Sequence, residues 1–273
     1  MREVGERTVR AADGLPLHVI DWGGTEGPPL LFVHGSFGHA RLWDFAVAAL
    51  PRERRAIALD LPGHGESAHA AREERYAFDR LVDDLRGAVE LLNEPPVMAG
   101  HSIGSALTMH YAAAHAATLS GAVLMDIDPH PPEQQARHLN EVGRQAPKAY
   151  PTLDGAVARE ARMAPGASPA AHLHMARHGY RPGVDGLEQK FDQGFLRSVR
   201  TWDARPLLAR ITVPALVVRG SESTVMSPEG YRDLLVGLPN ARGELVAGAT
   251  HQLHLERPAV VATLIERFVA GLG

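Results

Sequence analysis

Short apolar runs alternate with longer amphipathic segments through the first half of this 273-residue chain. In 78–92, apolar residues recur at the three-to-four-residue spacing of one helix face. Such alternation is typical of a parallel sheet, because parallel strands need crossover connections, which are usually helices. We therefore predict an α/β fold with a mostly parallel, twisted sheet flanked by helices. The expected strands of this half are 17–21, 30–33, 56–59, 97–99 and 121–124, and the expected helices are 41–50, 78–92 and 102–116.

The pattern changes after residue 128. From 129 to about 206 the sequence is rich in proline and charged residues, with helical segments and no strong strand pattern. Strand patterns return at 216–218 and 244–246, each followed by a helical segment, 228–235 and 258–272. We predict a core domain made of 1–128 and 207–273, and a helical cap, or lid, inserted as 129–206.

Composition excludes several classes of function. The formal net charge is −4, with 28 Lys+Arg against 32 Asp+Glu, so no strongly basic surface is expected and nucleic acid is not an expected partner. The absence of cysteine excludes disulfides, cysteine-based metal sites and a thiol nucleophile. Segment 1–10 is polar, unlike a secretory signal, and no apolar run reaches 18 residues. We expect a cytoplasmic protein without a membrane partner and make no prediction of its oligomeric state.

The motif Gly100-His101-Ser102-Ile103-Gly104 fits G-x-S-x-G and lies between an expected strand and an expected helix. A serine on such a sharp turn needs very small neighbours, because larger ones collide with the flanking backbone. The turn lifts the serine hydroxyl above the sheet edge at a helix N-terminus. There the backbone N–H of Ile103 can face a developing oxyanion. This context predicts that Ser102 is a catalytic nucleophile.

Three further segments, together with this motif, resemble the α/β-hydrolase family, in its serine esterase and lactonase branch. They are 34–38 (His-Gly-Ser-Phe-Gly), 60–67 (Asp-Leu-Pro-Gly-His-Gly-Glu-Ser) and 248–251 (Gly-Ala-Thr-His). The resemblance implies that the turn after the second of the expected strands supplies another oxyanion donor. Its candidate is the backbone N–H of Ser36, with Phe37 as the alternative. The loop that begins at Asp60 is expected to be structural.

Position selects one of the fifteen histidines as the general base. His251 follows the last expected strand through a loop of small residues, and in this family that loop brings a histidine over the nucleophile. It would deprotonate Ser102 and later protonate the leaving group. His254 is expected to be packed, and His101 is expected to point away from the nucleophile in a structural role.

The acid that orients His251 is not fixed by the resemblance. In this family an aspartate usually follows the seventh strand, three or four residues after the glycine that ends it. Here that glycine is Gly220, and Ser223 and Thr224 occupy the two positions. We favour Asp126, which ends the preceding expected strand, since some members of the fold carry the acid there. Glu222, in the usual loop but one residue early, is the alternative.

A serine nucleophile favours acyl transfer through a serine ester, and a small-molecule carboxylic ester or lactone is the expected substrate. An acyltransferase, a perhydrolase or a C–C bond hydrolase on the same scaffold stays open, as does a non-catalytic small-molecule binding protein. No cofactor or metal is expected; His174 and His178 have a zinc-compatible spacing but no evident third ligand. Apolar residues of the lid that could line an acyl pocket are Met163, Met175, Phe191, Phe195 and Trp202.

Overall fold

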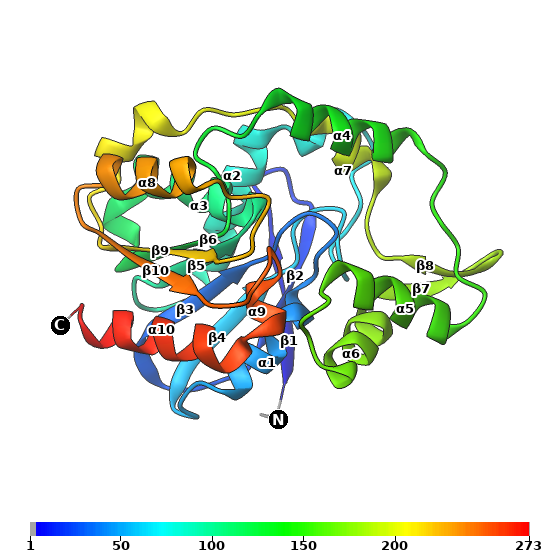
Figure 1. Cartoon of the computed structure of the whole chain (residues 1–273), viewed down its shortest axis with the longest axis horizontal. Helices are drawn as coiled ribbons and strands as arrows, with labels where there is room; N and C mark the ends of the chain where they lie inside the picture. The colour runs from blue at the N-terminus through cyan, green and yellow to red at the C-terminus, as the bar shows by residue number, and fades with distance from the viewer. Residues whose placement is uncertain (1–3, 273) are drawn as a thin grey trace.

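An eight-stranded sheet forms the centre of the molecule (Figure 1), in the order β1-β2-β4-β3-β5-β6-β9-β10. The structure is a computed structural model that describes residues 4–272; positions 1–3 and 273 of the predicted core domain lie outside it. β2 runs antiparallel to both neighbours, and the other pairs are parallel, so the predicted α/β fold is confirmed. The strands are β1 Gly5–Arg10, β2 Pro16–Asp21, β3 Glu26–Val33, β4 Arg54–Leu59, β5 Val97–His101, β6 Gly121–Met125, β9 Ala215–Gly220 and β10 Ala241–Val246.

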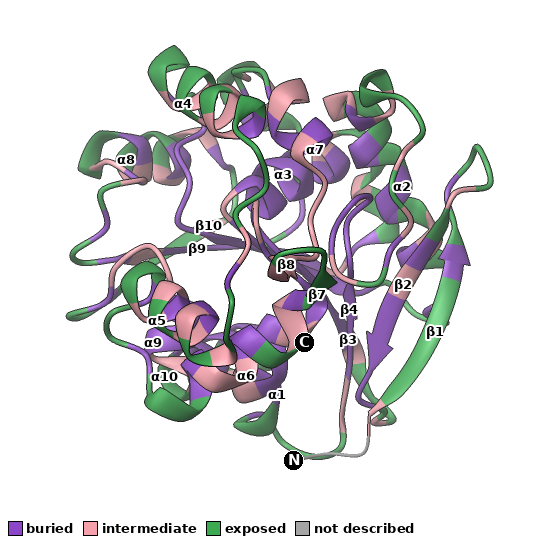
Figure 2. Ribbon diagram, turned by 90° about the vertical axis from the view of Figure 1, so that its right-hand side faces the viewer, coloured by how far each residue is buried: buried purple, intermediate pink, exposed green. Residues whose placement is uncertain are grey.

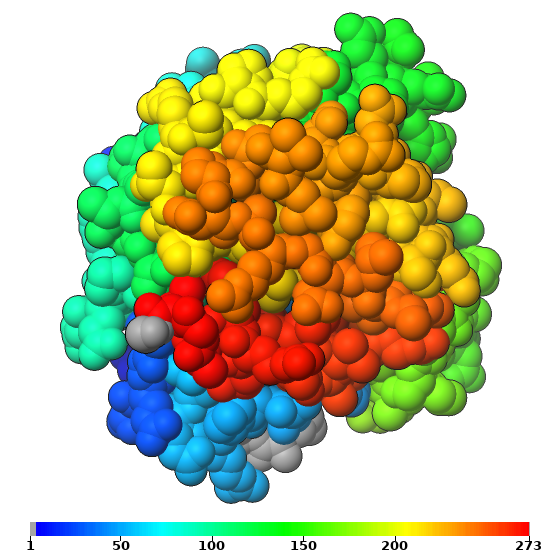
Figure 3. Space-filling view, turned by 60° about the vertical axis from the view of Figure 1, so that its left-hand side comes forward, coloured from blue at the N-terminus to red at the C-terminus, as the bar shows by residue number. Residues whose placement is uncertain are grey.

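Helices cover both faces of this sheet, and each face buries its own apolar cluster. One cluster joins the sheet to α2 (Phe78–Glu90), α3 (Ile103–His115) and α8 (Pro228–Gly237). The other joins it to α1 (Asp44–Ala48) and α10 (Pro258–Ala270). β5 and β6 are buried along their whole length. Burial is concentrated in the sheet and in the helix faces turned toward it (Figure 2), and the C-terminal part of the chain, orange to red, covers one side of the molecule (Figure 3). The shorter helical turns are η1 Ala40–Trp43, η2 Glu73–Tyr76, η3 Ala116–Thr118, η4 Arg205–Arg210 and α9 Leu253–Glu256.

The connection from β6 to β9 contains the stretch predicted as an insertion. It is mainly helical, with α4 (Glu133–Arg144) packed on α7 (Gln193–Ser198), and α5 (Leu153–Met163) packed on α6 (Pro169–Gly179). It differs from the expectation at 180–189, where β7 (Tyr180–Gly183) and β8 (Gly186–Gln189) form a hairpin. These strands have four residues each and no alternation of apolar and polar positions, so periodicity does not reveal them.

Two other differences from the sequence-based expectations have simple causes. β1 was not expected, because it is an edge strand with only Val9 buried and so lacks a hydrophobic pattern. The helix expected at 41–50 is a 3₁₀ turn followed by the single-turn helix α1. The buried strands and the long helices agree with their expected positions to within a few residues, because each has a continuous apolar run or face.

Candidate active site

Ser102 lies on the turn between β5 and α3 with φ 55° and ψ −126°, which is strained for a residue with a side chain. The small neighbours that the motif requires are explained by contacts. A Cβ on Gly100 would lie 2.4 Å from the carbonyl oxygen of Gly104. A Cβ on Gly104 would lie 2.4 Å from the carbonyl oxygen of Val33. The strained turn is also tied to the sheet, because the Ser102 N–H donates to the carbonyl of Met125 over 2.9 Å. The Ser102 side chain is thereby held above the carboxyl edge of the sheet.

A second serine, Ser105, braces this turn. The buried hydroxyl of Ser105 accepts the N–H of Met125 over 2.8 Å and donates to the carbonyl of Gly100 over 2.7 Å. It therefore joins the end of β6 to the end of β5. The family motif ends one residue before Ser105, so pattern matching does not point to it.

The turn at 34–38 packs directly against the nucleophile, since a Cβ on Gly35 would lie 2.9 Å from Ser102 Cβ. Buried His34 organises it: its Nε2 accepts the Leu61 N–H over 3.0 Å, so its Nδ1 donates to the Gly35 carbonyl over 2.8 Å. Burial lowers the pKa of His34, consistent with this neutral form. Phe37 has φ 62°. Ile103 is the first residue of α3, where backbone N–H groups have no partner within the helix.

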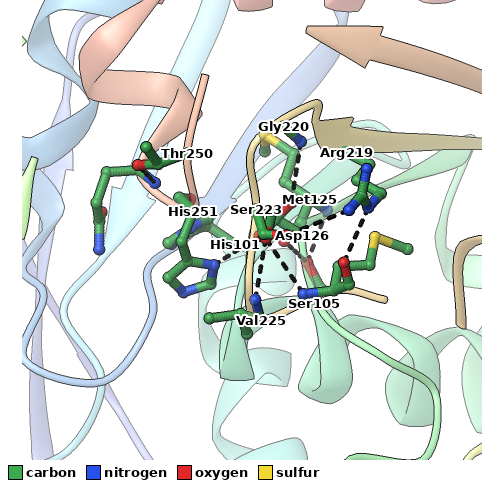
Figure 4. Close-up of polar contacts among 12 residues, drawn as sticks. His101, Ser105, Met125, Asp126, Arg219, Gly220, Ser223, Val225, Thr250 and His251 are labelled. Atoms are coloured by element: carbon green, nitrogen blue, oxygen red, sulfur yellow. Dashed lines mark hydrogen bonds and ion pairs between the residues drawn. The ribbon is translucent and has the colours of Figure 1, made fainter. Parts of the chain in front are cut away.

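His251 and Asp126 are paired (Figure 4). His251 Nδ1 donates to Asp126 Oδ2 over 2.7 Å, which leaves Nε2 of the same ring for another partner. Asp126 is fully buried at the end of β6, and its other oxygen accepts the N–H of Gly220 over 3.0 Å. Of the two candidate acids, Asp126 is therefore the one that contacts His251.

Ser223, at a position where the family usually has the acid, binds the same carboxylate. Its hydroxyl donates to Asp126 Oδ2 over 2.5 Å and accepts the N–H groups of Val225 and Met226. Glu222 is exposed, and within residues 4–272 its carboxylate makes no hydrogen bond or ion pair. The alternative acid is thus not brought to His251.

Two neutral histidines pack beside His251. His101 Nε2 donates to the His251 carbonyl over 2.8 Å, and the ring of His254 lies 4.3 Å from that of His101. Burial, reinforced by the neighbouring histidines, lowers the pKa of His101 well below its ordinary value and lowers that of His254 to about 3. His254 is packed, as expected, but the expectation that His101 points away is wrong: its ring lies 4.6 Å from that of His251 and lines the same cavity as Ser102. Neither His101 nor His254 carries a positive charge that would compete with His251 at neutral pH.

The other polar motifs have structural contacts. Asp60 accepts the N–H groups of Ala40 and Glu66 and the ring N–H of His18, so its loop is held together by one carboxylate. His174 is paired with buried Asp44 over 2.7 Å. Among residues 4–272, no group of three or more potential ligands is arranged to hold a metal ion.

Ser102 and His251 line one cavity of about 290 Å³, together with Ser36 and Phe37. Met163 and Met175 also line it, whereas Phe191 lies behind it against Phe37, at 4.9 Å between ring centres. Phe195 is fully buried against His64 and does not line this cavity. Trp202 lines a smaller pocket next to Ser102.

The sequence reading missed a buried polar group on the far wall of the cavity. Arg159 and Glu160 of α5 form an ion pair of 2.8 Å, and the Tyr180 hydroxyl donates to Glu160 over 2.6 Å. Burial opposes the charge of Arg159, but the Glu160 carboxylate together with Tyr180 and Tyr150 outweighs it, so the pKa of Arg159 is raised. The Arg159 guanidinium also lies 5.8 Å from the centre of the Phe37 ring, next to the candidate oxyanion turn. Isolated charges in irregular helical segments carry no motif, so only the fold reveals this group.

No helix among residues 4–272 is long and apolar enough to cross a membrane. The cytoplasmic location and the absence of nucleic-acid partners stay predictions from the sequence.

Comparison with known proteins gives matches over most of the chain. Residues 28–258 match the family model described as alpha/beta hydrolase fold. Esterase YbfF of Escherichia coli (strain K12) is 25% identical over 253 residues, covering 88% of this chain and 92% of the relative. A dihydrolipoyllysine-residue acetyltransferase component of an acetoin cleaving system from Pseudomonas putida is 42% identical over 100 residues, 36% of this chain. This match covers 26% of the relative, so the chain spans about a quarter of its length.

Solved structures share the same fold. A crystal structure of E-2-(acetamidomethylene)succinate hydrolase superposes with a TM-score of 0.87 at 23% sequence identity. The superposition covers 98% of this chain and 100% of the other. At this level of sequence identity, the similarity shows a shared fold and nothing more.

Proposed function

Because the chain belongs to the alpha/beta hydrolase fold family, we propose that it is a serine hydrolase that cleaves a carboxylic ester or lactone. Ser102 is the nucleophile, His251 the general base, and Asp126 the acid that orients His251. The backbone N–H groups of Ile103 and Ser36 form the oxyanion hole, with Phe37 as the alternative to Ser36.

In the first half of the reaction, the Ser102 hydroxyl attacks the carbonyl carbon of the substrate while its proton passes to His251 Nε2. A bond forms between Ser102 Oγ and the carbonyl carbon, and the carbonyl oxygen takes the negative charge. The backbone N–H groups stabilise that charge. The bond to the leaving oxygen then breaks, and His251 gives its proton to this oxygen, which departs as an alcohol.

In the second half, water replaces the alcohol. His251 Nε2 takes a proton from water, whose oxygen attacks the acyl carbon of the Ser102 ester. Collapse of this second intermediate releases a carboxylic acid and returns the proton to Ser102 Oγ. The buried Asp126 carboxylate stabilises the His251 imidazolium in both halves.

The observation that carries the proposal is the 2.7 Å contact between His251 Nδ1 and Asp126 Oδ2, with Ser102 and His251 on the wall of one cavity. The Nδ1 contact sets the tautomer, so Nε2 is the nitrogen available as base. The strained backbone of Ser102 supports the same role, since strain persists where the surroundings enforce it, often at active sites.

We also propose that 129–206 acts as the cap of the core domain formed by 1–128 and 207–273. Support comes from the cavity walls: His138, Arg159, Met163 and Tyr180 of this stretch face the same space as Ser102. A cap over the cavity would exclude bulk water and strengthen the electrostatic contacts of the reaction.

The experiment is an assay of purified protein on p-nitrophenyl esters and lactones, with a fluorophosphonate probe to label the nucleophile. We expect turnover and labelling by the wild type and neither by Ser102→Ala. Asp126→Asn should lose most of its turnover, whereas Glu222→Gln, the matched acid-to-amide control in the exposed loop, should keep it. Collapse of Glu222→Gln with an active Asp126→Asn would contradict the assignment of the acid.

The alternatives have their own signatures in the same assay. An acyltransferase or perhydrolase would transfer the acyl group faster to an added alcohol, thiol or peroxide than to water. A C–C bond hydrolase would cleave a β-diketone better than any ester. Tight binding of a small molecule with neither turnover nor labelling would instead indicate a non-catalytic binding protein.

A further inference from the structure

Ser102 faces two spaces of very different size. The large cavity, about 290 Å³, is the one that His251 lines. A second pocket of about 30 Å³ is also lined by Ser102 and by the candidate oxyanion residues Ser36 and Ile103, but His251 is not among the described residues that line it. Its other walls are Ile127, Pro131, Gln135, Ala136, Leu139, Val199 and Trp202.

The position of His251 distinguishes the two spaces chemically. The leaving oxygen must receive its proton from His251, so it must come within hydrogen-bond distance of this ring. The alcohol part of an ester therefore extends into the large cavity. The acyl chain extends from the same carbonyl carbon in the other direction, toward the small pocket next to the oxyanion donors.

Given the ester hydrolysis proposed above, on which this step rests, we infer that the small pocket binds the acyl group and that the enzyme prefers short acyl esters of larger alcohols. A space of about 10–15 Å³ on this measure holds one water-sized group, so about 30 Å³ holds about two. Acetyl and propionyl groups fit this size. A lactone fits less well, because its ring joins the acyl and alcohol parts that the site separates.

Two residues are shared between the walls of the small pocket and those of a further cavity. Val199 and Ile103 line both the small pocket and a cavity of about 360 Å³ between η2, α2 and α7. Val199 is buried and follows α7, and the Asn140 side chain of α4 donates to its carbonyl over 2.9 Å. Val199 is thus a fixed wall, and its side chain limits the length of the acyl group.

The test is a series of p-nitrophenyl esters with acyl chains of two to eight carbons, measured as kcat/KM. For the wild type we expect the highest kcat/KM with two or three carbons and a fall of about tenfold for each further methylene at first. Val199→Ala opens the wall toward the further cavity, so its optimum should move to longer chains. Ala136→Val narrows the pocket, so kcat/KM should fall more for propionyl and butyryl esters than for acetyl esters.

Val225→Ala is the matched control, because the same two methyl groups are removed from the wall of the large cavity. It should leave the preferred acyl length unchanged and alter KM for bulky alcohols. A wild type that prefers long acyl chains overturns the inference while the proposed function stands. An unchanged ratio of kcat/KM between short and longer acyl esters in both Val199→Ala and Ala136→Val, with thermal melting showing folded proteins, also overturns it. Absence of turnover on every ester, with no labelling of Ser102, contradicts the proposed function itself.

Discussion

At the scale of single residues, backbone strain is concentrated at the candidate site. Within residues 4–272, the non-glycine residues with positive φ are Phe37, Ser102 and Asp126, at 62°, 55° and 56°. Each such residue costs about 1–3 kcal/mol, and the surrounding contacts must hold it. Those contacts come from the segments that follow β3, β5 and β6, three parallel neighbouring strands whose carboxyl ends meet here. The strain is therefore localised in the three loops that carry the proposed nucleophile, acid and oxyanion donor.

Moving the carboxylate from position 126 to position 223 tests whether the site works with its acid at either position. Asp126→Asn keeps a residue that adopts positive φ but removes the charge, so kcat should fall roughly 10³- to 10⁴-fold. Adding Ser223→Asp restores a carboxylate at the usual family position, in direct contact with residue 126. We expect kcat to recover at least about tenfold in the double variant, measured by steady-state kinetics.

Ser221→Asp in the Asp126→Asn background is the matched control, because it makes the same serine-to-aspartate exchange in the same loop, while residue 221 is exposed and makes no hydrogen bond with Asp126. It should give no recovery. Equal recovery of kcat in both double variants would mean that any negative charge added to this loop restores activity. That result would contradict a role of the acid that depends on contact with His251.

At the scale of elements, the close packing of α3 against β3 depends on one glycine. Gly104→Ala puts a Cβ 2.4 Å from the Val33 carbonyl and 2.6 Å from the His34 carbonyl, so the helix must shift from the sheet. We expect a loss of at least about 2 kcal/mol in the free energy of unfolding, measured in urea, and loss of turnover.

Gly155→Ala in α5 makes the same substitution where space is open, since the nearest atoms lie 3.7 Å from the added Cβ. It should leave the free energy of unfolding unchanged or raise it by up to about 1 kcal/mol, because alanine has fewer conformations in the unfolded chain. If Gly104→Ala were as stable as this control, the requirement for a small residue after Ser102 would not come from contact with β3.

The elements also explain what sequence reasoning reached and what it did not. Ser102, His251 and the buried strands have local signals: a motif between a strand and a helix, a position after the last strand, continuous apolar runs. No local sequence signal decides between Asp126 and Glu222 as the acid, because the answer depends on which strands are neighbours in the sheet. β6, β9 and β10 lie side by side, so the loops that carry Asp126, Ser223 and His251 converge. The Arg159–Glu160 pair depends in the same way on how α5 packs.

At the scale of the whole molecule, buried histidines make stability depend on pH. His39, His64 and His254 are buried, and burial lowers the pKa of each to about 3. In the unfolded chain each has an ordinary pKa near 6.5. Between pH 6.5 and 3 the unfolded state therefore binds protons that the folded state does not. Their contribution to stability is fully present above pH 6.5 and is lost as the pH falls through this window.

Each of these histidines should cost about 1 kcal/mol of unfolding free energy between pH 6.5 and 5.5, because the unfolded imidazole is only half protonated at pH 6.5, so the three together should cost about 3 kcal/mol over this interval. His18 acts in the opposite direction, because its pairing with Asp60 overcomes burial and raises its pKa. Urea unfolding followed by tryptophan fluorescence at pH 7 and pH 5.5 measures the difference.

His254→Gln isolates one contribution. Neither ring nitrogen of His254 has a hydrogen-bond partner in the described part of the chain, so the substitution removes a titrating group without breaking a hydrogen bond. The loss of stability between pH 7 and 5.5 should shrink by about 1.3 kcal/mol relative to the wild type. A wild type equally stable at both pH values, or a variant with an unchanged loss, would mean that these histidines take up protons while folded. The acid sensitivity of the molecule would then come from groups other than its buried imidazoles.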